Sequence, residues 1–296
     1  MKLTEKKHST AQRVLLFGAP KSGKTQLAGE LSKHFNLLWF DLENGYSTLL
    51  KLPTEAQENI NLISLPDTRS YPIAIETMLK VIKGGQVTIC EEHGKVSCPK
   101  CKADNAPTVT VHLDSLDNET IVVIDSLTQL TNSAISHITK GESDEYKLTY
   151  DDWGNLGKLM DIILSHIQQA RYNVICISHE TEAEMEDGKK KIVPVAGTRN
   201  FSRNTAKYFD HVIYCELKNK KHAVGSATDY SMSILTGSRT DVKLEALPSA
   251  SLLSIFKPEV VSAVPVATTQ TNTQGQQSAA NLADKLAKLK AQQEGK

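Results

Sequence analysis

The chain has 296 residues, 40% of them hydrophobic and 23% charged, and its 34 basic residues balance 34 acidic ones. This length suits one large domain or two modest ones, and the zero net charge argues against nucleic-acid binding over the whole surface. No apolar run approaches the roughly 18–20 residues that cross a bilayer, and residues 1–7 lack the apolar segment of a secretory signal, so we expect a cytoplasmic protein without membrane contact.

Short apolar runs alternate with longer segments of helical period between residues 12 and 257. We expect strands at 14–17, 37–40, 121–124, 174–177 and 211–214, and helices at 25–34, 70–82, 126–138 and 153–170. Apolar strands without polar alternation suit a parallel sheet that is covered on both faces. The order therefore predicts an α/β fold with a mainly parallel, doubly wound sheet, preceded by an N-terminal extension at 1–11.

A glycine-rich motif separates the first expected strand from the first expected helix. It matches G-x-x-x-x-G-K-[ST] and comprises Gly18, Ala19, Pro20, Lys21, Ser22, Gly23, Lys24 and Thr25. Glycines let consecutive backbone N–H groups surround a phosphate, and the following helix presents its positive end. Lys24 would reach the β- and γ-phosphates, and the Thr25 hydroxyl would bind Mg²⁺. The motif predicts a site for ATP with Mg²⁺.

Two acids at strand ends complete the expected nucleotide site. Asp125 follows the apolar run 121–124 and supplies the second metal carboxylate that a P-loop needs. The next residue is Ser126 rather than a glutamate, so a catalytic base must come from elsewhere. Glu43 follows the strand after the P-loop helix and is our candidate, with Asp41 in support; the alternative is a solvated acidic turn.

His179 lies at the tip of the strand whose apolar run is 174–177, and it is the candidate for sensing the γ-phosphate. Glu180 is a second choice, and the alternative is a histidine that only stabilises the strand end. A polar group at this edge of a parallel sheet faces the same ligand crevice as the P-loop.

Residues 84–120 interrupt the core pattern and contain three of the five cysteines. Cys90, His93, Cys98 and Cys101 form two close pairs, a spacing that suits tetrahedral Zn²⁺. All four positions are filled by protein, which predicts a structural metal in a small zinc-ribbon-like insertion. The odd cysteine count and this clustering favour a reducing compartment over disulfides, and Cys176 and Cys215 are expected in the core.

The sequence after Pro258 changes character. Residues 258–277 lack aromatic side chains and predict a disordered linker. A short amphipathic helix is expected at 278–292, with Leu282, Leu286 and Leu289 on one face. It is a candidate contact for a single-strand DNA-binding protein, or else a frayed tail.

With these motifs in order, the chain resembles the RecA-like branch of P-loop ATPases, and within it the phage-encoded proteins that contain little more than a RecA core. The resemblance depends on 18–25, 41–43, 122–126 and 177–180 and covers about 12–257. It implies a RecA-like core, Glu43 as catalytic base, Lys24 in the phosphate site, and His179 coupling nucleotide to DNA. Some members promote single-strand annealing or recombination, which in a phage-encoded protein takes place in the host cytoplasm.

The resemblance also implies two DNA-binding loops and a contact between subunits. The first loop, at about 140–152, is acidic here. The second contains the basic residues Lys189, Lys190, Lys191, Arg199, Arg203 and Lys207 together with Phe201. Basic groups neutralise phosphates and an aromatic ring can stack on a base of single-stranded DNA. In a homo-oligomer, Arg239 is the candidate to reach the neighbour's γ-phosphate, with Lys218, Lys220 and Lys221 as alternatives.

The sequence thus predicts an ATP-hydrolysing protein that binds single-stranded DNA as an oligomer and promotes annealing or strand exchange. Two alternatives remain open at this stage. One is a P-loop kinase that transfers the γ-phosphate to a small acceptor. The other is an adaptor in DNA replication or repair that nucleotide only stabilises.

Overall fold

The structure is a computed structural model that describes residues 11–68, 71–143, 145–219, 221–225, 233–239 and 251–256. Most of the expected N-terminal extension lies outside the described residues, and so do the linker at 258–277, the helix at 278–292 and Lys220. The side chain of Lys221 is likewise outside the described part of the chain.

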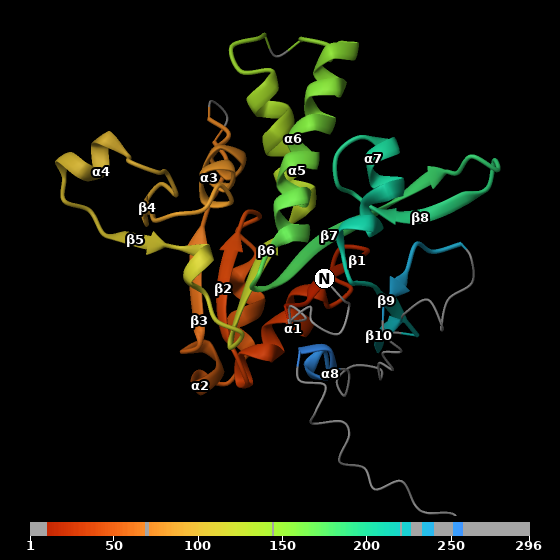
Figure 1. Ribbon diagram of the computed structural model, residues 1–296, viewed down its shortest axis with the longest axis horizontal. Helices are drawn as coiled ribbons and strands as arrows, with labels where there is room; N and C mark the ends of the chain where they lie inside the picture. Colours follow the sequence, from red (N-terminus) through yellow and green to blue (C-terminus); the bar gives the residue numbers. More distant parts are fainter. Residues whose placement is uncertain are drawn as a thin grey trace, which may run out of the picture. The chain divides into compact units, whose positions relative to one another are not determined.

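One sheet of nine strands forms the centre of the described fold (Figure 1). Its main path runs in the order β10-β9-β1-β7-β6-β2-β3, and the six strands from β9 to β3 are parallel. Strands β8, β10 and β11 pair antiparallel with β7 or β9. The strands are β1 (Arg13–Gly18), β2 (Asn36–Asp41), β3 (Ile60–Ser64), β6 (Thr120–Asp125), β7 (Asn173–Glu184), β8 (Lys190–Pro194), β9 (His211–Lys218), β10 (Lys221–Gly225) and β11 (Gly237–Ser238). The expected mainly parallel α/β fold is confirmed.

Apolar side chains of the strands are buried on both faces of this sheet. In β1, Leu15 and Phe17 pack in one core cluster, which includes residues of α3, α5 and α6. Val14 and Leu16 pack in a second cluster on the opposite face, with residues of α1 and α8. Burial on both faces is why these strands carry uninterrupted apolar runs rather than alternating ones.

The helices are α1 (Lys24–Gly29), α2 (Thr54–Gln57), α3 (Ile73–Val81), α4 (Pro99–Ala103), α5 (Leu127–Ile138), α6 (Tyr150–Gln169), α7 (Arg199–Asn204) and α8 (Leu253–Phe256). The helix expected at 25–34 continues beyond Gly29 only as a 3₁₀ turn, Glu30–Lys33. Helix α6 begins three residues before the expected start because Thr149 and Asp152 form a capping box there. Helices α5 and α6 lie side by side (Figure 1).

The segment 84–120 contains a separate two-stranded antiparallel sheet, formed by β4 (Val87–Cys90) and β5 (Thr108–Val111). It is attached to the core through its first turn. The Thr77 hydroxyl of α3 donates to the carbonyl oxygen of Gly94 at 2.8 Å. Gly94 has φ +63°, and a Cβ there would lie 2.7 Å from the Ser64 carbonyl oxygen. Close approach to β3 therefore requires glycine at this position.

Candidate functional site

The carboxyl ends of four parallel strands meet at one edge of the sheet. The pairing register sets Gly18 beside His179 and Asp125 beside Asp41. A cavity of about 590 Å³ opens at this edge. It is lined by Pro20 to Gln26, Glu43, Gly45, Ser47, Thr48, Lys51, Asp125, Ile177, His179 and His222. The sequence motifs from four separate segments thus line a single cavity, as expected for this edge of a parallel sheet.

The P-loop depends on one glycine for its close approach to the neighbouring strand. Gly18 has φ +150°, and a Cβ there would lie 1.9 Å from the Cys215 carbonyl oxygen of β9. At the end of the loop, Lys24 is buried and donates from Nζ to the carbonyl oxygens of Gly18 and Ala19 at 2.9 and 2.8 Å. Burial lowers the pKa of Lys24. A buried ammonium at the start of a helix favours an anion such as a phosphate.

Thr25 and Asp125 form the expected pair of oxygen ligands. The Thr25 hydroxyl lies 3.1 Å from Asp125 Oδ2, and both face the cavity. Burial, and then the charge of Glu43, raise the pKa of Asp125 to about 7. A carboxylate and a hydroxyl are the hard oxygen donors that Mg²⁺ prefers, and a cation would relieve this crowding of negative charge. The residues therefore fit the metal that the P-loop implies.

Glu43 is held by residues from two other elements. The Ser126 hydroxyl donates to Glu43 Oε1, and His179 Nε2 lies 3.4 Å from its carboxylate. Burial alone would raise the pKa of Glu43, but the hydrogen bonds from His179 and Ser126 outweigh it and hold the pKa below its usual value. The carboxylate is therefore ionised and oriented toward the nucleotide cavity.

Asp41 contributes through the backbone instead of the cavity. Its carboxylate accepts hydrogen bonds from the backbone N–H groups of Glu43, Gly45 and Tyr46 at 3.2, 3.0 and 3.3 Å. These bonds shape the turn that presents Glu43. Glu180, the second choice for the sensor, accepts instead from the Tyr214 hydroxyl of β9 at 2.7 Å.

Two residues at the start of α5 that were not among the predicted site residues hold Glu43 and His179 in place. Ser126 caps α5, accepting from the Gln129 N–H at 3.2 Å while it donates to Glu43. Thr128 Oγ1 accepts from the backbone N–H of His179 at 2.8 Å. The cap position was visible in the sequence, because Ser126 precedes an apolar helical pattern. Its contact with Glu43 depends on strand order and had no local signal.

A second cavity of about 510 Å³ adjoins the nucleotide cavity and shares Glu43 and His179 with it. Its remaining lining residues are Leu42, Asn44, Pro66, Asp67, Thr128, Gln129 and Asn132. Asp67 accepts from the Ser133 hydroxyl and the Gln129 amide at 2.9 and 3.3 Å. Glu43 thus separates two cavities, a feature that no sequence motif indicated.

The four predicted zinc ligands lie together in the insertion. One ligand atom from each of Cys90, His93, Cys98 and Cys101 lies within 4.8 Å of all the others. The three thiols are buried, and burial followed by the neighbouring thiols raises the pKa of Cys101 to about 12. Three sulfurs and one imidazole nitrogen form a donor set that suits structural Zn²⁺. Burial disfavours the charged thiolate form of these cysteines, and a bound cation would stabilise it. The cluster fits zinc.

The residues predicted to bind DNA lie around a β-hairpin and a short helix. Lys190 and Lys191 belong to β8, Lys189 to the turn before it, and Arg199 and Arg203 to α7. Phe201 lies half-buried on α7 and stacks on Tyr208 with ring centroids 5.7 Å apart. The ring is partly buried against the core, and stacking of Phe201 on a base stays a prediction. Lys207 lies over the Tyr208 ring at 4.6 Å.

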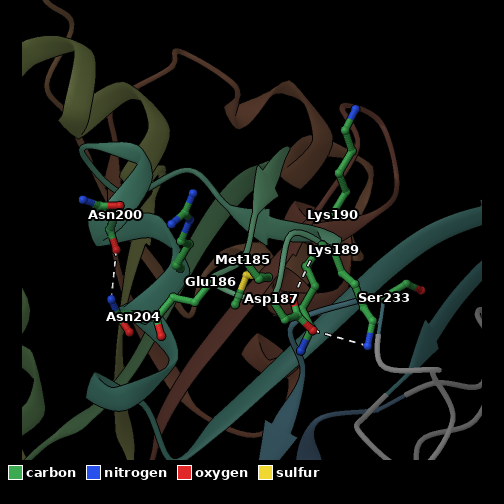
Figure 2. A pocket seen from close by; sticks show the side chains of 10 residues that line it. Met185, Glu186, Asp187, Lys189, Lys190, Asn200, Asn204 and Ser233 are labelled. Atoms are coloured by element: carbon green, nitrogen blue, oxygen red, sulfur yellow. Dashed lines mark hydrogen bonds and ion pairs between the residues drawn. The ribbon is translucent and has the colours of Figure 1, made fainter.

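The hairpin and helix enclose a cavity of about 1020 Å³ (Figure 2). Its lining residues are Met185, Glu186, Asp187, Lys189, Lys190, Lys191, Asn200, Arg203, Asn204 and Ser233. Strand β7 contains His179 of the nucleotide cavity and ends at Glu184, directly before the lining residue Met185 of this cavity.

Arg239 lies at the sheet edge opposite the P-loop. Its guanidinium pairs with Asp210 at 2.9 Å, and β11 joins the amino end of β9 at His211 and Val212. The nucleotide cavity of the same chain lies at the other end of β1. Lys218, in contrast, ends β9 on the P-loop side and is exposed.

None of the described helices has the length and apolar character needed to span a membrane.

Comparisons with known proteins assign a family to most of this chain. A family model described as an AAA domain matches residues 10–241. A search of curated proteins finds no match. Among solved structures, the chain is similar to an ATPase from the type III secretion system of pathogenic bacteria, with 14% identity and a TM-score of 0.41. The similarity covers 77% of this chain and 58% of that one, so the chain spans little more than half the length of that ATPase.

Proposed function

The chain belongs to the AAA-domain family and is a P-loop ATPase, and we propose that it uses ATP binding and hydrolysis to control its binding of single-stranded DNA. One observation carries this proposal. Lys24, the Thr25–Asp125 pair and Glu43 line one cavity, which β7 connects to a hairpin rich in lysine. Such continuity supports a single protein that both turns over nucleotide and contacts DNA.

The proposed hydrolysis assigns one role to each group at the cavity. Backbone N–H groups of the P-loop and the Lys24 ammonium bind the phosphate oxygens of ATP. Thr25 and Asp125 would hold Mg²⁺, which supplies positive charge to those oxygens. Glu43 orients a water molecule against the γ-phosphate and accepts its proton, while Ser126 and His179 keep the Glu43 carboxylate in place. His179 then reports the state of this site along β7.

The proposed DNA contact uses the basic residues around the hairpin. Lys189 pairs with Asp187 at 3.3 Å and Lys190 with Glu182 at 3.4 Å, and all four side chains are largely exposed. Exposed pairs contribute little to stability, so these lysines exchange an acidic partner for a phosphate at small cost. Through this contact the protein would promote annealing or strand exchange in recombination.

The proposed assembly is a head-to-tail homo-oligomer. Arg239 lies at the opposite edge of the sheet from its own P-loop, and so would reach a nucleotide only on another copy. Lys218 is the alternative, because it is exposed on the P-loop side.

In the insertion, we propose that Zn²⁺ bound by Cys90, His93, Cys98 and Cys101 holds the turns together.

The decisive experiment measures ATP turnover by the full chain with and without a single-stranded oligonucleotide, with Lys24→Ala as the control. We expect single-stranded DNA to raise turnover severalfold and Lys24→Ala to abolish turnover in both conditions. Turnover that does not change with single-stranded DNA would argue against the DNA function and leave the ATPase activity intact.

Zinc is tested on the same preparation by elemental analysis. We expect one zinc per chain, and much less in a Cys98→Ser, Cys101→Ser double variant.

The second cavity favours one competing function, phosphoryl transfer to a small acceptor. It adjoins Glu43 and carries polar side chains that could bind a hydroxylated ligand. The two functions differ in their products. Hydrolysis releases phosphate and ADP in equal amounts, whereas transfer in the presence of an acceptor yields ADP without matching phosphate.

A further inference from the structure

The cavity between the β7–β8 hairpin and α7 has two walls of different chemistry (Figure 2). Asn200 and Asn204 lie on one wall, one turn apart on α7, and the turn residues Met185, Asp187 and Lys189 lie on the other. The cavity's volume, about 1020 Å³, is at the upper end of the range for ligand pockets. The α7 wall therefore offers amides together with the Arg203 guanidinium, and the hairpin wall offers charged side chains and an apolar thioether.

The charges around this cavity favour an anionic ligand. Four basic side chains line it against two acidic ones, Glu186 and Asp187. Arg203 adds a more specific signal, because its Nε is buried and has no hydrogen-bond partner among the residues that the structure describes. A buried donor left unpaired is costly, so a phosphate oxygen that reached Arg203 would relieve this cost.

The amides of Asn200 and Asn204, on the same helix as Arg203, supply both donors and acceptors. The Asn204 Nδ2 donates to the Asn200 backbone carbonyl at 3.1 Å, which leaves its Oδ1 available. The Asn200 side-chain amide is exposed and has no hydrogen-bond partner within the described part of the chain. An asparagine amide matches the N6 donor and N7 acceptor of adenine in a bidentate pair. Bases of a single strand are free to turn these edges toward a protein.

From these observations we infer that the cavity binds one nucleotide unit of single-stranded DNA and prefers adenine. Arg203 and the hairpin lysines neutralise the phosphates on either side, Asn200 and Asn204 hydrogen-bond the base edge, and Met185 packs against the base. This inference depends on the proposed DNA function and deepens it, since it adds base selectivity to a contact otherwise based on charge.

The test compares binding of labelled oligo(dA) and oligo(dT) to the full chain by fluorescence anisotropy at two salt concentrations. We expect oligo(dA) to bind about tenfold more tightly than oligo(dT). A double variant, Asn200→Ala with Asn204→Ala, should lose this preference and bind oligo(dT) as the unmodified chain does. Asn155→Ala, at an exposed position of α6, is the matched control and should keep the preference.

A charge variant separates the two kinds of contact. Lys190→Ala with Lys191→Ala should weaken binding to both oligonucleotides equally and reduce the salt dependence, by about 0.7 in the log–log slope for each phosphate that is no longer neutralised. Lys83→Ala, which is exposed and outside the cavity, should change neither.

The possible failures are distinguishable. If the chain binds oligo(dA) and oligo(dT) equally, or if the asparagine variant weakens both to the same extent, the adenine site is wrong and the DNA function stands. If the unmodified chain binds neither oligonucleotide, both the inference and the proposed DNA function are wrong.

Discussion

Glu43 lies at the junction of three elements, and its setting supports the proposed catalytic role without a glutamate after Asp125. Strand β2 leads into the turn that Asp41 organises, Ser126 reaches Glu43 from the start of α5, and His179 reaches it from β7. The proposed base and the proposed metal carboxylate therefore come from neighbouring strands instead of consecutive residues.

We predict that Glu43→Gln slows ATP hydrolysis by about 10²- to 10⁴-fold, the usual worth of a general base, while ATP binding is retained. The amide keeps the shape of the side chain but cannot accept the proton of water. Single-turnover kinetics and nucleotide-binding titrations on the same preparation would separate the two effects. Glu55→Gln, at an exposed position, is the control. Equal loss of binding and turnover would mean that Glu43 only shapes the cavity.

The raised pKa of Asp125 predicts that the free energy of unfolding of the metal-free protein depends on pH. Burial and Glu43 raise its pKa to about 7, so between about pH 4 and pH 7 the folded chain keeps a proton that the unfolded chain releases. Stability falls as pH rises through this window, and the loss is complete above about pH 7. Asn does not ionise, so Asp125→Asn should be more stable than the unmodified chain at pH 8, by up to about 4 kcal/mol.

The measurement is thermal unfolding in EDTA without nucleotide from pH 5 to pH 8. The gap between Asp125→Asn and the unmodified chain should widen across this range in favour of the variant. Parallel curves would mean that Asp125 is already ionised in the folded chain at pH 5. The same variant should also lose magnesium-dependent nucleotide binding.

Among the elements, two glycines illustrate opposite constraints. Gly18 ends β1 where a Cβ would collide with the Cys215 carbonyl of β9 at 1.9 Å. Gly157 lies inside α6, where a Cβ would have no atom within 4 Å. Gly18 is required by the packing of β1 against β9. Gly157 weakens α6, and no close contact in the described structure requires a glycine there.

The same substitution at these two sites should therefore have opposite effects. Gly157→Ala is expected to stabilise the chain by about 1 kcal/mol, which raises the unfolding temperature by about 2–4 °C. Gly18→Ala should lower the unfolding temperature sharply and abolish ATP binding. Circular dichroism melts and ATP titrations test both. A tolerated Gly18→Ala would show that β1 and β9 can move apart at the P-loop.

At the scale of the whole molecule, the sheet separates two candidate functional ends. The nucleotide cavity lies at the carboxyl ends of the parallel strands, and Arg239 lies at the amino end of β9. An arginine at that position cannot serve its own nucleotide, because β1 alone separates the two by six residues of extended chain.

We predict that ATP increases the oligomer mass of the protein in native mass spectrometry, and that Arg239→Ala lowers turnover per chain without changing ATP affinity. Lys218→Ala is the parallel variant, because Lys218 is the alternative residue for this contact. A protein that remains monomeric at full turnover would rule out a subunit-shared site. Loss of turnover in Lys218→Ala alone would transfer the role to Lys218.

The sequence was sufficient for the features that depend on local chemistry. Three features depend only on residues that lie close together in the sequence. They are the P-loop pattern between a strand and a helix, the apolar runs of a sheet covered on both faces, and the cysteine–histidine spacing. The helix boundaries were less accurate, because they depend on a few local hydrogen bonds, such as the two of the capping box formed by Thr149 and Asp152.

Features that depend on strand order had no such local signal and were decided only by the folded chain. Ser126 meets Glu43 because β6 lies beside β2, although 83 positions separate them in the sequence. The two further cavities exist because separate segments converge around them. Local sequence patterns indicate which side chains of a segment are buried or bind a metal. Contacts between distant segments, in contrast, are set by the packing of the whole sheet.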